Sequence, residues 1–404
     1  MKIMKNIRTS FVILTLLFSV QCSPKPATSG TGESPERTHP ENASVQVGAD
    51  QLDVLLPLLE GKNIALVVNH TSLVGQTHLT DTLMSSGITI KKVFAPEHGF
   101  RGAAADGEKI SDGVDSKTGL PIVSLYGSNR KPAPEQLADV DLVIFDIQDV
   151  GTRFYTYIST MHLVMEACAE QGKKMIILDR PNPNGNYVDG PMRVPSMKSF
   201  VGMHPVPIVH GLTVGELAQM INGEGWLENG VKCDFQIITV KNWEHKNFYS
   251  LPVKPSPNLP NDQAVKLYPS LCLFEGTVVS VGRGTQTPFL IIGNPELKDM
   301  PFSFTPKPIP GMSNKPPQEG KVCYGLDLSS VEVEPRINLR YLLEFYQKYP
   351  DKEKFFIGSF DRLAGTPQLK EQIKKGMTED QIRETWREGL DTYRAMRAKY
   401  LLYP

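Results

Sequence analysis

Short apolar runs recur through the first half of the chain, and a polar segment follows each of them. The runs span residues 63–68, 88–94, 121–126, 141–145 and 174–178. Nearly continuous apolar runs of this length are typical of strands that are buried on both faces, as in a parallel sheet. Helical patterns at residues 51–59, 80–87 and 154–171 lie beside or between these strands. This alternation predicts an α/β fold with a Rossmann-like, doubly wound parallel sheet.

The second half of the chain is less regular, and its many prolines predict long loops. A helix is expected after Thr213, because this residue can act as the N-cap while Glu216 completes a capping box. Further strands are expected at 235–240, 322–328 and 355–358, helices at 338–349 and 378–400, and a proline-rich connection at 252–260. Because 404 residues are many for one hydrophobic core, we predict two domains, 48–212 and 213–404.

The N-terminus has the pattern of an export signal. Three positive residues, Lys2, Lys5 and Arg8, precede an apolar stretch at 11–20 that is too short to span a bilayer. Cys22 follows shortly after, which resembles a bacterial lipoprotein signal with Cys22 as the lipidated residue. A cleaved soluble signal peptide is the alternative, and both interpretations predict export.

The segment after the signal differs in composition from the rest of the chain. Residues 1–22 are assigned to the signal peptide, and residues 23–47, rich in Ser, Pro, Thr, Gly and Glu, to a flexible tether. We therefore expect a membrane lipoprotein that faces the periplasm, with no further stretch that could cross a membrane.

Composition and motifs argue against several kinds of ligand. The net charge is -1 and no long basic run is present, so nucleic acid is not an expected partner. Residues 69–75, after the first predicted strand, contain one glycine where a dinucleotide fingerprint needs three. The chain has no GxxxxGK[ST] loop, no GxSxG elbow and no CxxC pair. We expect no cofactor and no metal, and buried free thiols at the cysteines after Cys22.

The loop after the predicted strand at 88–94 contains candidate catalytic carboxylates. It holds Glu97 and, a little further on, Glu108. Ligands of open α/β sheets bind at the carboxyl ends of the strands, so both carboxylates could face one pocket as an acid/base pair. The alternative is a structural loop in which Arg101 forms a salt bridge with either glutamate.

The second half offers a third carboxylate and a cation. Glu275 follows an apolar stretch, and Arg283 lies between two glycines. An arginine in this setting could bind a carboxylate of the substrate through paired hydrogen bonds. The alternatives are that Arg283 lies in a surface turn and that Glu275 is simply the partner of Arg283.

Several segments together resemble the bacterial exo-β-N-acetylmuramidases, a glycoside hydrolase family long described as a conserved domain of unknown function. They are residues 95–102, 145–157, 179–183 and 255–260, and the pair 273–277 and 282–285. The similar region extends over roughly residues 50–404. The resemblance implies a Rossmann-like N-terminal domain and a smaller C-terminal α/β domain that closes a cleft. It also implies release of N-acetylmuramic acid from the non-reducing ends of peptidoglycan fragments.

The resemblance and the polar clusters together define the candidate site. The catalytic candidates are Glu97, Glu108 and Glu275. The substrate-binding candidates are Asn69, His98, Arg101, Asp146, Asp149, Arg153, Tyr155, Arg180, Asn182 and Arg283. Glycoside hydrolysis needs two carboxyl groups, and the lactyl carboxylate of muramic acid needs a cation such as Arg153, Arg180 or Arg283.

Two other classes of function stay open at this point. A non-catalytic, periplasmic sugar- or solute-binding lipoprotein would also have two α/β domains around a cleft. An esterase or amidase acting on wall peptides would need an activated nucleophile, and no Ser or Cys motif in the sequence offers one.

Overall fold

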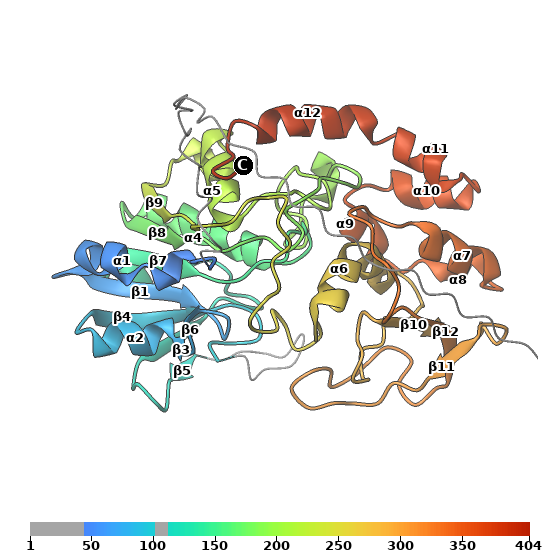
Figure 1. Cartoon of the computed structure of the whole chain (residues 1–404), viewed down its shortest axis with the longest axis horizontal. Helices are drawn as coiled ribbons and strands as arrows, with labels where there is room; N and C mark the ends of the chain where they lie inside the picture. Colours follow the sequence, from blue (N-terminus) through green and yellow to red (C-terminus); the bar gives the residue numbers. More distant parts are fainter. Residues whose placement is uncertain (1–43, 102–111) are drawn as a thin grey trace, which may run out of the picture. The chain divides into compact units, whose positions relative to one another are not determined.

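A seven-stranded sheet forms one half of the computed structural model, which describes residues 44–101 and 112–404 (Figure 1). Its order is β5 (Gly113–Val114), β6 (Pro121–Ser124), β4 (Thr89–Ala95), β1 (Asn63–Val68), β7 (Leu142–Asp146), β8 (Lys174–Leu178) and β9 (Phe235–Ile238). All neighbours pair in parallel except β5 and β6, which are antiparallel. The predicted Rossmann-like sheet is therefore confirmed.

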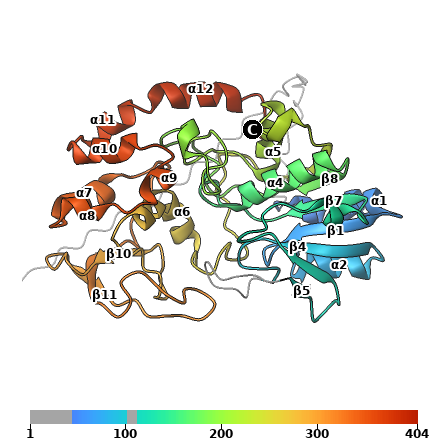
Figure 2. The ribbon, with the colours of Figure 1, turned by 180° about the vertical axis from the view of Figure 1, so that it is seen from behind.

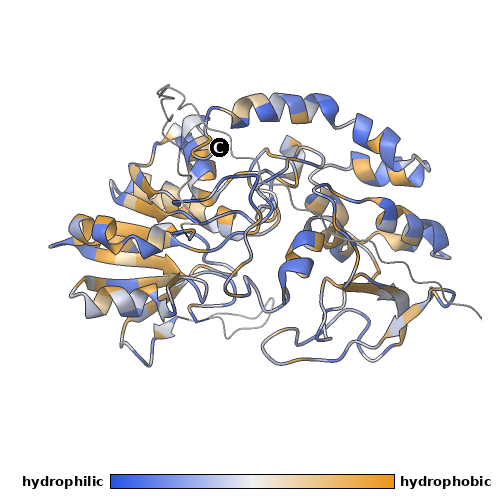
Figure 3. Cartoon of the chain, in the orientation of Figure 1, coloured by the Kyte–Doolittle hydropathy of each residue, from blue (hydrophilic) through white to orange (hydrophobic). Residues whose placement is uncertain are grey.

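Helices cover both faces of the sheet. On one face lie α1 (Leu52–Leu59) and α2 (Leu79–Ser85), and on the other α4 (Tyr157–Glu170) and α5 (Val214–Gly223). Successive strand residues point to opposite faces. Thus Ile64 and Leu66 join the buried cluster of α1 and α2, whereas Ala65 and Val67 join that of α4 and α5. This burial on both sides explains the continuous apolar runs, which appear as orange strands in Figure 3.

Smaller elements complete this half. They are the 3-10 turns at Gly48–Asp50, Pro195–Met197 and Glu228–Gly230, the hairpin of β2 (Leu73–Val74) and β3 (Thr77–His78), and α3 (Pro134–Leu137). The predicted capping box of α5 is present, because Glu216 N donates to Thr213 Oγ1 and Thr213 N donates to Glu216. Helix α4 begins at Tyr157, later than predicted, so residues 154–156 remain in a loop.

The other half combines a small sheet with short helices. The antiparallel sheet has the order β10 (Ile291–Asn294), β12 (Cys323–Asp327) and β11 (Phe302–Phe304). The helices are α6 (Asp262–Leu271), the 3-10 helix η4 (Cys272–Gly276), α7 (Arg340–Lys348), α8 (Lys352–Phe355), α9 (Phe360–Ala364), α10 (Gln368–Lys374), α11 (Glu379–Glu384) and α12 (Arg387–Arg397). Seen from behind in Figure 2, α12 runs back toward α5, where the chain ends.

Two predicted elements of this half are wrong in detail. Residues 355–358 are no strand: Phe355 ends α8, and Phe356 makes only an isolated bridge with Thr277. The apolar side chains of this run pack instead in an aromatic cluster, in which the ring centroids of Phe356 and Phe360 are 4.5 Å apart. The helix predicted at 378–400 is divided into α11 and α12. Apolar runs this short do not distinguish a strand from a buried helical segment.

The boundary at residue 212 stays a prediction. Residues Ser44–Pro404 form one compact unit. Within it, α5 and β9 follow residue 212 and yet belong to the sheet layers. The chain also returns to this sheet at its end, where the Tyr403 hydroxyl donates to Asp179 Oδ2 at 2.5 Å. The two halves are thus joined by several crossings of the chain.

The cysteines of the described residues lie inside the protein. Cys168, Cys233, Cys272 and Cys323 are all buried and free, as the sequence predicted. Over residues 44–101 and 112–404, no helix has both the length and the apolar character needed to cross a bilayer.

Candidate active site

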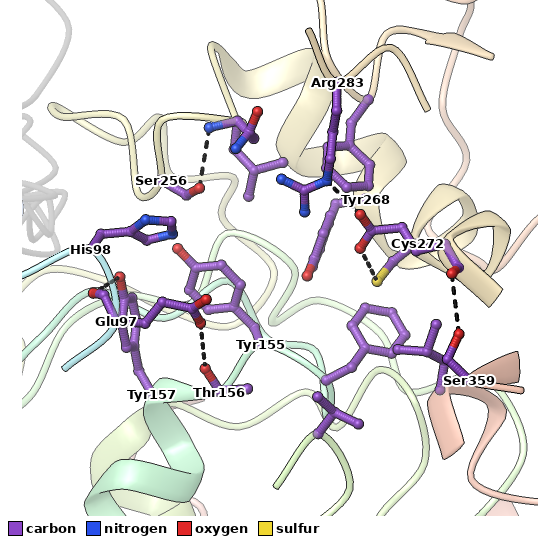
Figure 4. Close-up of a pocket in the computed structure, with 17 residues that line it drawn as sticks. Glu97, His98, Tyr155, Thr156, Tyr157, Ser256, Tyr268, Cys272, Arg283 and Ser359 are labelled. Carbon is purple, nitrogen blue, oxygen red and sulfur yellow. Dashed lines mark hydrogen bonds and ion pairs between the residues drawn. The ribbon is translucent and has the colours of Figure 1, made fainter. Parts of the chain in front are cut away.

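A cavity of about 350 Å³ lies where the loop after β4, the start of α4 and the segment α6–η4 meet (Figure 4). Its lining residues come from distant parts of the chain, from Glu97 to Leu363. Four of the predicted site residues besides Glu97 line it: His98, Tyr155, Glu275 and Arg283. The cavity therefore brings together predicted site residues from both halves of the chain.

Glu97 lies two residues beyond the end of β4 and is half-buried. Both carboxylate oxygens accept hydrogen bonds: Oε1 from the Tyr126 hydroxyl at 2.8 Å, and Oε2 from Thr156 Oγ1 at 3.3 Å. The Tyr157 hydroxyl donates to the Glu97 backbone carbonyl at 3.4 Å. Glu97 is thus a carboxylate held in one orientation at the wall of the cavity.

His98, the next residue, has an unusual backbone conformation. Its φ of 68° lies in the left-handed region, which side chains other than Gly, Asn and Asp seldom adopt. A turn follows, because Gly99 N donates to the Pro96 carbonyl at 3.0 Å. The ring is buried and lines the cavity. Strained conformations of this kind concentrate at functional sites.

Aromatic side chains form the floor between the two walls. Tyr155 and Tyr157 pack edge to face with ring centroids 5.0 Å apart, and Tyr155 and Tyr268 lie 5.9 Å apart. The Tyr155 hydroxyl donates to the Pro255 carbonyl at 2.7 Å, which ties α4 to the proline-rich connection. Burial raises the pKa of the phenols of Tyr155, Tyr157 and Tyr268, so all three stay neutral.

The opposite wall carries an ion pair. Arg283 Nε donates to Glu275 Oε1 at 2.5 Å, and the guanidinium lies 5.3 Å from the ring centroid of Phe289. The Arg283 side chain is only 12% exposed, so the alternative of a surface turn is wrong. The alternative that Glu275 and Arg283 pair with each other is confirmed. Cys272 Sγ lies 3.7 Å from Glu275 Oε2, and burial raises the pKa of this thiol, which therefore stays protonated.

Two polar residues of the proline-rich connection also line the cavity. Asn258 N donates to Ser256 Oγ at 3.2 Å, and Asn258 Nδ2 donates to the Met312 carbonyl at 3.0 Å. The Asn258 side chain is thereby fixed at the cavity wall. Together with the carboxylates and the aromatic floor, these groups suit a polyhydroxylated ligand with an apolar face.

Other predicted binding residues have structural partners instead. Asp146 and Arg180 form a buried, bidentate ion pair with contacts of 2.5 and 2.9 Å. Asn69 Oδ1 accepts from Thr71 N at 2.9 Å and shapes the turn after β1. Asp149 Oδ2 accepts from Gly151 N at 2.6 Å, and Asn182 Nδ2 donates to the Leu212 carbonyl at 2.9 Å. These five side chains hold the loops at the sheet edge and do not line the cavity.

Arg153 is the clearest correction. Its side chain is 0% exposed, and its guanidinium donates to four backbone carbonyls. Nη1 contacts Pro191 O at 2.9 Å and Val206 O at 2.7 Å, and Nη2 contacts Leu363 O at 3.1 Å and Ala364 O at 2.7 Å. Burial lowers the pKa of Arg153 to about 9, which still leaves it charged at neutral pH. A side chain used in this way cannot bind a substrate carboxylate.

Arg101 does not pair with Glu97, so that part of the structural alternative is wrong. Arg101 makes a bidentate contact with Asp115, at 2.9 and 2.8 Å, and a further contact with Asp81 at 3.3 Å. The hydrogen bond from Arg101 holds the pKa of the Asp115 carboxyl well below its usual range. Glu108 lies outside the described residues, so its position relative to Glu97 stays a prediction.

The sequence interpretation missed several residues that contribute to the site. They are Tyr126, Thr156, Ser256, Asn258 and Tyr268. Tyr126 ends a predicted strand and Thr156 belongs to a predicted helix, and neither position by itself indicates a site residue. A signal was available for Tyr126, since its strand ends at the same sheet edge as that of Glu97. In the parts of the chain that the structure describes, no group of three His, Cys, Asp or Glu side chains could hold a metal ion.

Comparison with protein families matches both halves of the chain. A family model described as "Exo-beta-N-acetylmuramidase NamZ, N-terminal" matches residues 64–263. One described as "Exo-beta-N-acetylmuramidase NamZ, C-terminal" matches residues 266–403. A curated relative, the peptidoglycan beta-N-acetylmuramidase NamZ of Bacillus subtilis (strain 168), is 37% identical over 405 residues. The alignment covers 93% of this chain and 95% of that protein.

Two solved structures have similar folds. Both are described as DUF1343 family proteins from Bacteroides fragilis NCTC 9343. One is 45% identical with a TM-score of 0.83, and the other is 30% identical with a TM-score of 0.74. In each case the match covers 89% of this chain and 99% of the other. The structural similarity therefore extends over most of this chain.

Proposed function

Because this chain belongs to the exo-β-N-acetylmuramidase family, we propose that it removes N-acetylmuramic acid from the non-reducing ends of peptidoglycan fragments. The observation that carries the proposal is one cavity with carboxylates on both walls. Glu97 lies on one wall, and Arg283 and Cys272, which both contact Glu275, lie on the other (Figure 4). A volume of about 350 Å³ is at the small end of ligand sites and suits a single sugar unit.

The chemistry uses the two carboxyl groups. A glycoside hydrolase needs one carboxyl group as proton donor to the leaving oxygen and a second as base or nucleophile. We assign Glu97 to this pair, because it is fixed by two hydroxyls at the carboxyl end of β4. Glu275 is the candidate partner on the facing wall, and Glu108 remains a further candidate. The neutral aromatic floor would exclude water from the sugar ring, which strengthens electrostatic contacts inside the site.

Arg283 is the candidate for recognising the lactyl carboxylate of muramic acid. It is the one arginine among the described residues that lines the cavity, since Arg153 and Arg180 are used inside the protein. A guanidinium can bind a carboxylate through two parallel hydrogen bonds. Its contact with Glu275 orients it toward the ligand space.

The alternative functions are weaker. A sugar-binding lipoprotein would not explain the match of both halves to a hydrolase family. An esterase or amidase would need a nucleophile, and Cys272, the thiol in the cavity, is kept protonated by burial.

The test is the cleavage of defined sugars. We expect the purified protein to hydrolyse a chromogenic N-acetylmuramide and to release N-acetylmuramic acid from disaccharides that carry it at the non-reducing end. Disaccharides with N-acetylglucosamine at that end serve as the control and should stay intact. Binding of the muramide without hydrolysis would favour the binding protein, and no interaction at all would contradict the proposal.

We also propose that the protein is exported and anchored through a lipid on Cys22. The support is the positive start of the chain, the apolar stretch at 11–20 and the cysteine that follows. A periplasm-facing location suits a wall substrate. Cys22 lies outside the described residues.

Metabolic labelling tests the anchor. A clickable palmitate analogue should label the wild-type protein and should not label Cys22→Ala. The variant Cys168→Ala is the matched control, since this cysteine is buried, and it should label like the wild type. Equal labelling of the Cys22→Ala protein would contradict the lipid assignment.

A further inference from the structure

We propose that Tyr126 and Thr156 are positioning residues that fix the carboxylate of Glu97 and keep it available as the base or nucleophile of the reaction. This inference rests on the proposed glycosidase activity and adds a role that family membership does not assign. It follows from what surrounds Glu97, from how the fold places those groups, and from the direction of their hydrogen bonds.

Each of the two hydroxyls binds a different oxygen of the Glu97 carboxylate. The Tyr126 hydroxyl donates to Oε1 at 2.8 Å, and Thr156 Oγ1 donates to Oε2 at 3.3 Å. A third contact, from the Tyr157 hydroxyl to the Glu97 carbonyl at 3.4 Å, restrains the backbone. With both oxygens bound, rotation of the carboxylate would break at least one hydrogen bond. The side chain is therefore oriented before substrate arrives, as a reacting group must be.

The parallel sheet places Tyr126 beside Glu97. Strands β4 and β6 are neighbours, and Ala95 pairs with Ser124. Glu97 and Tyr126 each lie two residues beyond this pair, so they leave the sheet edge side by side. The register of the two strands places Tyr126 beside Glu97, and no local sequence motif does so.

The Thr156 side chain does not cap the helix that it precedes. Thr156 is the N-cap residue of α4, where a threonine side chain usually accepts a hydrogen bond from the helix backbone. No such bond is present here, and its hydroxyl is directed at Glu97 instead. A helix cap is normally worth about 1 kcal/mol, so its absence argues for a function of this hydroxyl at the cavity.

The two hydroxyl donors favour one chemical role. Hydrogen bonds to both oxygens stabilise a carboxylate in its charged form, which suits a base or nucleophile better than a proton donor. Glu97 also faces the start of α4, a helix of 14 residues whose N-terminus carries partial positive charge. Titratable groups near Glu97 include His98 on its own loop and the neutral phenols of Tyr155 and Tyr157. The proton donor to the leaving oxygen is then a different group.

The experiment removes one hydroxyl at a time. For Tyr126→Phe and Thr156→Val we expect kcat on a chromogenic N-acetylmuramide to fall by about 10- to 100-fold, with KM changed little. The acidic limb of the pH profile of kcat/KM should move to higher pH, because the anion of Glu97 has lost a donor. Thr156→Ser keeps the hydroxyl and should restore most of the activity.

A matched control exists elsewhere in the chain. The Tyr400 hydroxyl donates to Glu224 Oε1 at 2.7 Å, which is the same pair of groups away from the cavity. Tyr400→Phe should leave kcat and the pH profile unchanged. In a Glu97→Gln background, adding Tyr126→Phe should lower kcat little further, because the two residues act as one unit.

The outcomes separate this inference from the proposed function. An inactive wild-type protein contradicts the glycosidase assignment itself. An active wild type with a Tyr126→Phe protein of unchanged kcat and pH profile overturns the positioning role alone. A shift of the basic limb, in place of the acidic limb, would show that Glu97 acts as the proton donor and would overturn the assigned role.

Discussion

Replacing Glu97 with glutamine is expected to lower kcat on a chromogenic N-acetylmuramide by about 10²- to 10⁴-fold. Glutamine preserves the shape of the side chain and can still accept from Tyr126, but it cannot act as an acid, base or nucleophile. Circular dichroism and the melting temperature should show an intact fold, because Glu97 lies at the cavity wall and not in the core.

The control for Glu97→Gln is Glu224→Gln. Glu224 also accepts a hydrogen bond from a tyrosine, at 2.7 Å, but it does not line the cavity. Its replacement should leave kcat near the wild-type value. A Glu97→Gln protein that also keeps near-wild-type kcat would remove Glu97 from the mechanism. The same assay on Glu275→Gln and Glu108→Gln would then locate the reacting carboxyl groups.

Replacing Arg153 with methionine is expected to lower the free energy of unfolding by roughly 3–5 kcal/mol. The side chain would still fill most of its volume, but four buried backbone carbonyls would lose their charged donor. Two of those carbonyls, Leu363 O and Ala364 O, belong to α9, at the cavity. We therefore expect a large loss of stability. Because Leu363 would be displaced from the cavity wall, we also expect a higher KM for the substrate.

Urea unfolding monitored by tryptophan fluorescence measures this effect. Arg394→Met is the control, because Arg394 pairs with Asp391 on the surface of α12 with its side chain 51% exposed. Exposed ion pairs contribute about 0–1 kcal/mol, so the unfolding midpoint of this variant should move little. A midpoint for Arg153→Met as close to the wild type as that of the control would show that the buried contacts are not stabilising.

The contrast between these two residues shows which part of the site was predictable. Glu97 was identified because its position depends on a local feature, the end of a strand whose apolar run is visible in the sequence. Arg153 also follows a strand, and its residue type is right for binding a carboxylate. Its actual partners lie up to 211 positions away along the chain, and no local pattern identifies them.

Local periodicity determined the sheet, the helices on its two faces and the capping box of α5, since these depend on residues a few positions apart. Residue type and short motifs in the sequence also indicated residues on both walls of the cavity, Glu97 on one and Glu275 with Arg283 on the other. Only the tertiary structure decided which polar groups line the cavity and which pair with other protein groups. Asp146 binds Arg180 instead of substrate, whereas Tyr126 and Thr156 reach Glu97. The physical reason is that a buried polar group must be paired, and strand register and long-range packing select its partner.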